Sequence, residues 1–394
     1  MTWLRDARAR LSRGDVLYVA GVAAAYVAAT ILAANAFHLV PDRMMVLAER
    51  IFQGRLDDPS FVNTVDSVAI GGRYYLAVSP LQVVPYLPFV PFDALHGIAR
   101  YLASLVPGLL AAWLALPLVR TYGARGTTAY WVAGFTAFGT LLFFVSTTGN
   151  LYYLAHAESF LALTCFLLEW SGRRRPLVLG VTLAVSFLAR PTTILACLPF
   201  GAALLWRNPD WRRRALAFVA PVAAGVLVMG LYNAARFGSP LETGYAISFL
   251  RERSLIARRS FGVFSLRHVP ENLKLALFTF FYARRSFPFL VPDTHGLSML
   301  VVSPGLLLAI RAGFAGPLQR TLWIAVALVA VPVLLYYGGG FLQYGFRYSL
   351  DFTPFLIPLV AMAVSTRFGW LERALFAVNA ASVTFGIVWL ITRP

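Results

Sequence analysis

The stretch that decides the fold is residues 16–36, VLYVAGVAAAYVAATILAANA, which contains no charged side chain. A helix of about 20 apolar residues crosses the roughly 30 Å hydrocarbon layer of a bilayer. Because lipid offers backbone groups no hydrogen-bond partners, we expect this stretch to be helical. Ala34-Asn35-Ala36 loosely resembles a signal-peptide cleavage site, but the apolar run is too long for a usual signal peptide. We therefore predict an uncleaved first transmembrane helix.

Further apolar runs follow along the whole chain. The long ones lie near residues 98–119, 128–147, 151–170, 214–235, 321–337 and 369–390. Shorter or proline-interrupted ones lie near residues 175–189, 191–206, 297–310 and 352–366. We predict an all-α transmembrane bundle of about eleven spans that forms one domain, residues 1–394, without a soluble domain.

The composition also indicates a membrane protein. Hydrophobic residues make up 59% of the 394 residues and charged residues 13%, about half the charged share of an average soluble domain. So little polar surface excludes a disordered chain, a coiled coil and an ordinary soluble globule. The formal net charge is +17. Basic chains often bind nucleic acid, but basic residues also collect in the cytoplasmic loops of multi-pass membrane proteins.

The arginines set the predicted orientation. With the N-terminus in the cytoplasm, the basic N-terminal arm and the short loops on that side carry 17 basic and 5 acidic residues, as the positive-inside rule expects. Two long segments, 37–97 and 236–296, then lie outside, where we expect short interfacial helices. We predict a lipid-bilayer environment and no nucleic-acid partner, because most of the excess charge orients the chain.

The first outer segment is acidic and holds the first candidate site. It carries Asp57, Asp58 and Asp66, and Asp66 precedes the stretch Gly71-Gly72-Arg73-Tyr74-Tyr75. A carboxylate at the membrane surface, beside a glycine turn and paired tyrosines, can act as a general base. From spacing alone, a solvated loop acid is the simpler interpretation.

Ionisable side chains also interrupt the predicted spans. His156 and Glu158 lie in the outer half of the fourth span, where such groups usually face a cavity or a partner. A satisfied polar pair near the headgroups is the alternative, and residues two apart cannot share one helix face. Arg190, in Leu188-Ala189-Arg190-Pro191-Thr192, suits an anionic phosphate, whereas snorkelling to headgroups is the simpler account.

The later outer segments are rich in arginine and aromatic residues. The second begins around Asn233 and Arg236 and suits lipid phosphates, although solvated charge explains any single member nearly as well. The last outer loop runs from Gly338 to Asp351. In it, Arg347 and Asp351 are four residues apart and are expected to pair on one helical face, as a structural salt bridge or as part of a site.

Taken in order, these stretches resemble a family of membrane enzymes. The chain is similar to polytopic glycosyltransferases of the GT-C superfamily, close to the bacterial relatives of dolichyl-phosphate-mannose–protein mannosyltransferases. The matching stretches are Asp66 through Gly72-Arg73-Tyr74-Tyr75 with Pro80 and Pro85, Ala155-His156-Ala157, Leu188 to Thr192, Asn233 with Arg236 to Pro240, Gly244-Tyr245, Phe289 to Asp293 with Gly296, and Gln343 to Asp351. They span nearly the whole chain and point to the superfamily rather than to a substrate.

The resemblance implies an enzyme that uses a polyprenyl-phosphate-linked sugar at the extracytoplasmic face of a bacterial plasma membrane. An acid in the first outer loop would deprotonate the acceptor hydroxyl, and the polyprenyl phosphate would leave with inversion at the anomeric carbon. Asp66 is the best match to that acid. Asp57 and Asp58 are rivals, because a paired acidic motif occurs in part of the superfamily.

The resemblance also implies that outer arginines neutralise the leaving phosphate, which is the electrostatic work that such a transfer needs. The first candidates are Arg190, Arg236 and Arg347, and the second are Arg73 and Arg285. His156 would bind the phosphate or position the donor sugar. The other substrate-binding candidates are Tyr74, Tyr75, Asn233, Glu242, Tyr245, Gln343 and Asp351. Some superfamily members use a divalent metal, but no residues here form a convincing metal set, so we expect neither a metal nor a cofactor.

One departure from the family bears on the acceptor. Many GT-C enzymes carry a soluble outer domain that holds a protein acceptor, whereas this chain ends at Pro394, just after its last predicted span. We therefore expect a small acceptor: a lipid, a lipid-linked glycan or a cell-wall polymer. Two alternatives stay open, a flippase or transporter for a lipid-linked sugar and a non-catalytic polyprenyl-phosphate-binding subunit. The polar clusters fall on the outer face, whereas a pump or symporter is expected to place them near the midplane.

Overall fold

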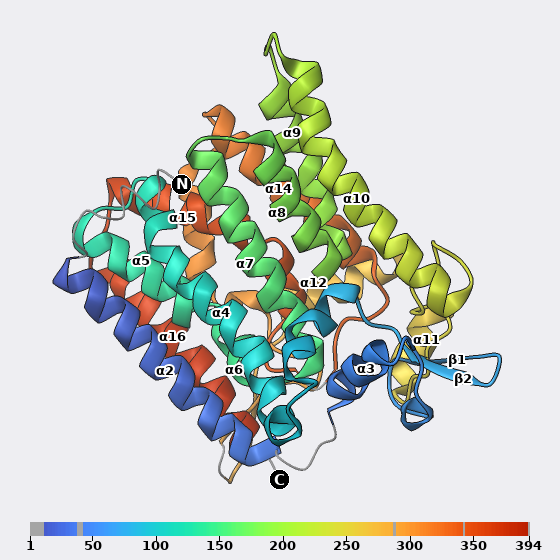
Figure 1. Cartoon of the computed structure of the whole chain (residues 1–394). Helices are drawn as coiled ribbons and strands as arrows, with labels where there is room; N and C mark the ends of the chain where they lie inside the picture. Colours follow the sequence, from blue (N-terminus) through green and yellow to red (C-terminus); the bar gives the residue numbers. More distant parts are fainter. Residues whose placement is uncertain (1–11, 38–41, 287–288, 342, 393–394) are drawn as a thin grey trace.

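The computed structural model describes residues 12–37, 42–286, 289–341 and 343–392. The chain is mostly helical, and six helices in the described part are long and apolar enough to cross a membrane (Figure 1). These six are α2 (Arg13–Phe37), α4 (His96–Thr121), α7 (Leu151–Ser171), α10 (Trp211–Phe237), α14 (Pro317–Leu335) and α16 (Trp370–Thr392). They confirm a helical fold and indicate a multi-pass membrane protein. Most of the basic N-terminal arm lies outside the described residues.

The run predicted as one span over 128–147 is broken. It forms α5 (Gly126–Phe138) and α6 (Leu141–Thr147), bent by 49°. Gly139 lies at the break, where an added Cβ would come 2.6 Å from the Phe135 ring. Thr140 then caps α6, because its hydroxyl accepts a hydrogen bond from the Leu142 amide at 3.3 Å. If this pair is one span, the helices that could cross a membrane number seven in the described part.

Three further apolar helices are shorter: α8 (Pro176–Ala189), α9 (Cys197–Leu205) and α15 (Thr353–Thr366). The predicted span near 297–310 forms instead α13 (Met299–Val302), followed by a 3₁₀ segment, Pro304–Ala312. The residue before a proline disfavours the α-helical conformation, and Ser303 has φ −137° and ψ 56°. The count of about eleven spans therefore stays a prediction.

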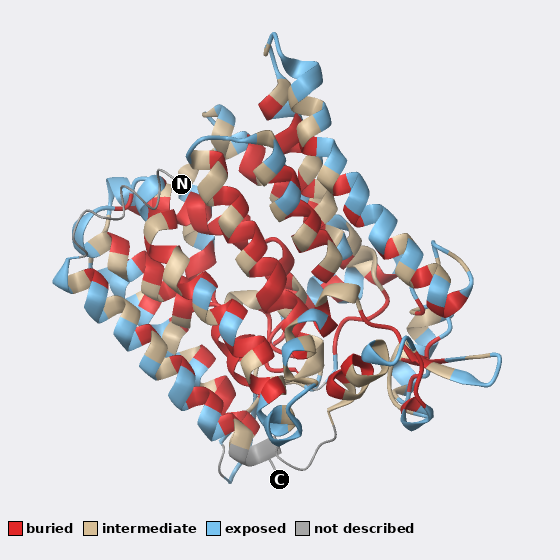
Figure 2. Ribbon diagram, in the orientation of Figure 1, coloured by how far each residue is buried: buried red, intermediate tan, exposed pale blue. Residues whose placement is uncertain are grey.

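The core lies between the central helices. Figure 2 shows α7 and α15 almost wholly buried, whereas α2 and α10 face outward over much of their length. The outward surface of α10 is apolar: Leu216, Leu227 and Leu231 are 71%, 62% and 61% exposed. Lipid is the solvent that suits such a surface, because leucines exposed along a whole helix face are unfavourable in water.

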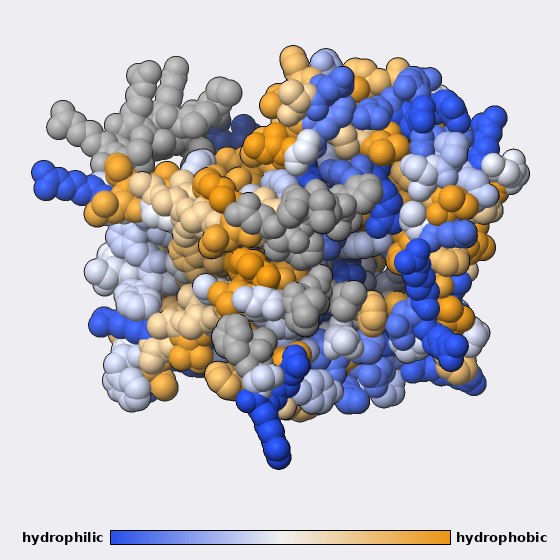
Figure 3. Space-filling view, turned by 90° about the horizontal axis from the view of Figure 1, so that it is seen from below, coloured by the Kyte–Doolittle hydropathy of each residue, from blue (hydrophilic) through white to orange (hydrophobic). Residues whose placement is uncertain are grey.

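Two long connecting segments gather at one end of the bundle (Figure 1). The first contains α3 (Arg43–Phe52) and the strands β1 (Ser67–Ile70) and β2 (Arg73–Leu76). The second contains α11 (Arg253–Arg259), α12 (Val269–Leu277) and the two-residue strands β3 (Tyr282–Ala283) and β4 (Leu290–Val291). The connection between α9 and α10 lies at the opposite end. Figure 3 shows the bundle from the end that carries the two connecting segments, and hydrophilic side chains gather there on the side of β1, β2 and α11.

The β1–β2 hairpin was not predicted. The strands are antiparallel, with Ser67 opposite Leu76 and Ile70 opposite Arg73. Gly71 and Gly72 connect them with φ of 57° and 76°, the left-handed conformation that a tight hairpin turn requires and that glycine adopts without strain. The flanking residues, SVAI and RYYL around Gly-Gly, were the sequence signal for this hairpin.

The first connecting segment is packed firmly onto the bundle. Its helix α3 buries Met44, Met45 and Leu47 in a cluster that includes Tyr86 and, from α7, Leu154. Asp42 caps this helix by accepting a hydrogen bond from the Met44 amide at 3.0 Å. This packing fixes the segment that carries the candidate acids relative to the transmembrane helices.

Candidate functional site

A cavity of about 990 Å³, including its open mouth, lies where the two connecting segments meet the loop after α14. We call it the central cavity. Four residues predicted as site residues line it: Asp66, Arg190, Tyr245 and Arg347. Much of the remaining wall is aromatic or polar and includes Tyr152, Thr192, Tyr336 and Tyr348. The structure therefore brings together residues that are up to 282 positions apart in the sequence.

Asp66 enters the central cavity from a constrained piece of backbone. Its φ is 63°, a left-handed conformation that is uncommon for residues other than glycine and is found at functional sites. Two hydrogen bonds hold it there: its amide donates to the Phe249 carbonyl at 3.0 Å, and its carbonyl accepts from the Ala77 amide at 2.8 Å. The carboxylate is half-buried, and no side chain in the described part of the protein donates a hydrogen bond to it.

The surroundings of Asp66 suit a base. Burial raises the pKa of its carboxyl group to about 6, although the positive charges of Arg347, Arg43 and Arg259 oppose that rise. A carboxylate with a pKa near the working pH is ionised at neutral pH and still binds a proton readily. Because no described group donates a hydrogen bond to its carboxylate oxygens, Asp66 can accept a proton from a group in the cavity.

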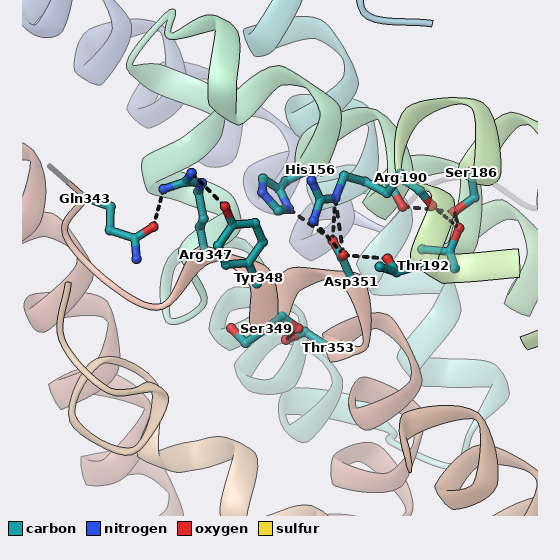
Figure 4. Close-up of polar contacts among 12 residues, drawn as sticks. His156, Ser186, Arg190, Thr192, Gln343, Arg347, Tyr348, Ser349, Asp351 and Thr353 are labelled. Atoms are coloured by element: carbon teal, nitrogen blue, oxygen red, sulfur yellow. Dashed lines mark hydrogen bonds and ion pairs between the residues drawn. The ribbon is translucent and has the colours of Figure 1, made fainter. Parts of the chain in front are cut away.

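Asp351 is the opposite kind of carboxylate (Figure 4). It is fully buried and accepts hydrogen bonds from His156 Nδ1 at 3.1 Å, Arg190 Nε at 2.9 Å, Arg190 Nη2 at 2.8 Å and Thr192 Oγ1 at 2.7 Å. Burial alone would raise the pKa of Asp351, but the charge of Arg190 and the hydrogen bonds hold it well below its usual range. Asp351 therefore orients Arg190 and His156 and is a poor proton acceptor.

The predicted pairing of Arg347 with Asp351 is wrong. Residues Arg347–Asp351 form a 3₁₀ helix, in which about three residues make a turn, so positions four apart do not share a face. Arg347 instead donates hydrogen bonds to Gln343 Oε1 and, at 3.1 Å, to the Tyr348 hydroxyl. Gln343 is held in turn by the His295 carbonyl at 2.5 Å and the Gly339 carbonyl at 3.1 Å.

Arg347 is the cation on the wall that is best placed for an anion. Its guanidinium lies 4.7 Å from the Tyr348 ring centre and 5.8 Å from that of Tyr153. Its Nε is buried without a hydrogen-bond partner, and no described carboxylate lies within ion-pair distance of it. The charge of Arg190, by contrast, is already paired with Asp351.

His156 lies outside the lining of the central cavity and contacts Asp351, the partner of Arg190. Its Nδ1–H is directed at Asp351, its ring lies 5.8 Å from that of Tyr348, and its Nε2 is buried without a partner in the described structure. It does not line the central cavity.

Arg236 and Asn233 do not reach the central cavity. Arg236 is 3% exposed and donates to the carbonyls of Leu76 at 2.5 Å and Val78 at 3.1 Å and to Asn233 Oδ1 at 3.0 Å. The Tyr232 ring covers it, with the guanidinium 3.6 Å from the ring centre. Backbone carbonyls and a ring face thus engage this guanidinium, which links α10 to the end of β2 and the residues that follow it.

The rival acids are also engaged elsewhere. Asp58 caps a 3₁₀ turn by accepting a hydrogen bond from the Ser60 amide at 2.7 Å, and it pairs with Arg50. Asp57 pairs with Arg55 at 2.8 Å. Neither carboxylate lines the central cavity. Of the three acids predicted as catalytic, the structure brings only Asp66 to the cavity wall.

The remaining predicted residues lie around the site. Arg73 is exposed at the hairpin turn, and Arg285 is exposed after β3. Tyr75 is buried against Phe237, with 6.1 Å between ring centres. Glu242 accepts a hydrogen bond from the Gly244 amide at 2.7 Å and so stabilises the turn before Tyr245. Tyr74 lines a separate cleft beside Asp66.

The sequence-based prediction missed two arginines whose charges act on Asp66. Arg43 Nη1 donates to the Val65 carbonyl at 3.0 Å, and its Nη2 to the Tyr152 hydroxyl at 3.4 Å. Arg259 Nη1 donates to the Ser248 carbonyl at 2.6 Å. Nothing in their local sequence distinguishes them from solvated loop charges, because only the folding of both segments places them near Asp66.

Among residues that the structure describes, no three His, Cys, Asp or Glu side chains converge as metal ligands. The expectation of no metal therefore stays a prediction, because other members of the implied superfamily use one.

No protein-family model, curated protein or solved structure matches this chain.

Proposed function

We propose that this protein is a GT-C-type membrane glycosyltransferase that moves a sugar from a polyprenyl-phosphate donor to an acceptor hydroxyl. The observation that carries the proposal is the central cavity, in which an unengaged carboxylate, Asp66, shares a wall with Arg347, a cation without a paired carboxylate among the described residues. A base and an anion-binding group in one cavity are the two elements that such a transfer needs.

In the proposed reaction, Asp66 removes the proton of the acceptor hydroxyl. The acceptor oxygen attacks the anomeric carbon from the side opposite the phosphate, so a new C–O bond forms while the bond to the phosphate oxygen breaks. Arg347 stabilises the negative charge that develops on the departing polyprenyl phosphate. Arg190, which Asp351 orients, provides a second positive charge on the cavity wall. The configuration at the anomeric carbon is inverted, and the proton passes from Asp66 to solvent.

The proposed location is the bacterial plasma membrane, with the N-terminus in the cytoplasm and the cavity on the outer side. The arginine distribution supports this orientation. The start of α2 lies toward the same end of the bundle as the arginine-rich α9–α10 connection, and α3, the hairpin and α11 lie at the other end (Figure 1).

A flippase for lipid-linked sugars is the second candidate, because the same cavity would hold a phosphate headgroup during translocation. A flippase needs no proton acceptor, however, and would not require the raised pKa of Asp66. Removal of the Asp66 carboxylate therefore separates the two functions.

The test is a transfer assay in proteoliposomes. The purified protein is supplied with radiolabelled polyprenyl-phosphate sugars and a lipid and cell-wall extract as acceptor, and wild type is compared with Asp66→Asn and Asp93→Asn. Asp93 is the matched control, because its carboxylate lies in the same connecting segment and is 100% exposed. We expect Asp66→Asn to lower transfer by about 10²–10⁴-fold and Asp93→Asn to leave it unchanged. Full transfer by Asp66→Asn would remove Asp66 from the role of base, and translocation without transfer would favour the flippase.

A further inference from the structure

A second cleft opens beside Asp66, and we call it the side cleft. Its volume is about 760 Å³, including its open mouth, and none of the residues that line it also line the central cavity. The first connecting segment contributes Asn63, Ser67 and Tyr74 to its wall, and the second contributes Ser248, Phe249 and Arg259. Ser67 directly follows Asp66 in the chain, so the cleft begins one residue from the proposed base.

Backbone hydrogen bonds connect the walls of the two hollows. The Asp66 amide donates to the Phe249 carbonyl at 3.0 Å, and the Phe249 amide donates to the Ser67 carbonyl at 2.7 Å. Asn63 has a φ of 53° and Asp66 a φ of 63°, so two non-glycine residues of one short loop adopt the left-handed conformation. Such strain persists where the surrounding structure requires a particular backbone path, and it clusters at functional sites.

The lining combines ring faces with neutral hydrogen-bonding groups. Tyr74 and Phe249 are aromatic, Asn63 carries an amide, and Ser67 and Ser248 carry hydroxyls. In the described structure, neither the Tyr74 hydroxyl nor the side-chain amide of Asn63 makes a hydrogen bond. The backbone carbonyl of Asn63 accepts one from Arg251 at 3.1 Å. These groups are therefore available to a ligand.

The side cleft has one charged side chain among the described residues that line it. This is Arg259, whose Nη1 donates to the Ser248 carbonyl at 2.6 Å and lies 3.4 Å from the Tyr245 carbonyl. The rest of the lining is uncharged. It suits a sugar ring, which has an apolar C–H face that packs on an aromatic ring and hydroxyls that bind amides and serines.

We propose that the side cleft is the acceptor subsite and that it binds a neutral carbohydrate, so that the acceptor is a glycan rather than a simple lipid. The inference rests on the proposed function, because it assigns the central cavity to the donor and the side cleft to the acceptor. The acceptor sugar lies on Tyr74 and Phe249, and its reacting hydroxyl reaches past Ser67 to the Asp66 carboxylate. A simple lipid acceptor would bring an alkyl chain, and the amide and hydroxyls of this wall give no advantage to such a ligand.

Direct binding tests the subsite without any transfer. The purified chain in lipid nanodiscs, free of sugar-based detergent, is titrated with maltotriose, mannotriose and chitotriose, and binding is followed by saturation-transfer NMR. We expect wild type to bind at least one trisaccharide. Tyr74→Ala should weaken that binding by at least tenfold, and Tyr74→Phe, which keeps the ring, should weaken it less.

Asn63→Gly is a second variant in case Tyr74→Ala fails to fold. It removes the amide while it relieves the left-handed strain, and it should weaken binding by about three- to tenfold for one or two lost neutral hydrogen bonds. Phe92→Ala is the matched control, because Phe92 is an aromatic residue of the same segment, 56% exposed and outside both hollows. It should bind like wild type.

Two results would overturn the inference: no binding of any of the three trisaccharides by wild type, or binding that is unaffected by both Tyr74→Ala and Asn63→Gly. If either occurred while the proteoliposomes still transferred sugar to a lipid, the proposed function would stand and the acceptor assignment would fail. If trisaccharides bound at the cleft but no sugar was transferred, the subsite would stand as a glycan-binding site and the proposed function would fail.

Discussion

Replacement of Asp66 by asparagine tests the electrostatics of the central cavity without any substrate. The pKa of Asp66 rises from 3.8 to about 6 in the folded protein, a difference of about two pKa units. Each unit corresponds to about 1.4 kcal/mol, so ionised Asp66 lowers the free energy of unfolding by at most about 3 kcal/mol. This is an upper limit, because the open cavity gives the carboxylate partial access to water.

The sign follows from proton binding. Between about pH 4 and pH 6 the folded protein holds the Asp66 proton more tightly than the unfolded chain does, so the free energy of unfolding falls as the pH rises through this window. Asparagine carries no proton to lose. Asp66→Asn should therefore gain stability relative to wild type as the pH rises, with little difference below pH 4 and the full difference above pH 6.

The assay is unfolding in nanodiscs, followed by fluorescence of the nine tryptophans at a series of pH values from 4 to 8. Asp93→Asn is the control for the loss of one carboxylate from the same segment, because the Asp93 side chain is 100% exposed. A difference between Asp66→Asn and wild type that stays constant over this range, or that favours wild type above pH 6, would refute the reasoning.

Four further predictions concern the same cavity. The transfer rate of wild type should rise with pH and reach half its maximum near pH 6, because the base must be ionised; a pH–rate profile that is flat from pH 5 to 8 would contradict this. Arg347→Gln should lower kcat for transfer by about 10²-fold, with correct folding checked by size-exclusion chromatography, whereas an unchanged kcat would assign the phosphate elsewhere. Gln343→Ala, which frees Arg347, should lower kcat more than it changes the KM for the acceptor, and Gln343→Glu should lower kcat at least as far, because its carboxylate pairs with the Arg347 charge; a wild-type rate in Gln343→Glu would show that the Arg347 charge does not act on the phosphate. Asp351→Asn should lower the free energy of unfolding by about 3–5 kcal/mol, because it leaves the Arg190 charge without its partner, and a melting temperature equal to that of wild type would show that the pair is not formed.

The sequence alone predicted a helical membrane fold from runs of apolar residues. The helical fold is confirmed, and six helices in the described part are long and apolar enough to cross a membrane. The sequence did not predict where individual helices break or end when local conformation and packing determine these points. One predicted span is broken at Gly139, where an added Cβ would come too close to the Phe135 ring, and Ser303-Pro304 ends another. A hydropathy pattern does not show either break, because hydropathy measures transfer to lipid and not the backbone conformation of single residues.

The candidate site was predictable only in part. Asp66, Arg190 and Arg347 line one cavity, whereas His156 and Arg236, predicted beside them, do not. Arg236 carries the same side chain as Arg347, yet the backbone carbonyls of Leu76, at the end of β2, and Val78 accept its hydrogen bonds. Which arginine keeps free donors depends on contacts between segments far apart in sequence, and no local pattern records those contacts.

The most direct measurement is an electron cryo-microscopy structure of Asp66→Asn in nanodiscs with a bound polyprenyl-phosphate sugar. The proposed function predicts a phosphate oxygen within hydrogen-bonding distance of the Arg347 guanidinium and an anomeric carbon that faces residue 66 across the central cavity. A headgroup bound outside this cavity, with Arg347 unengaged, would contradict it.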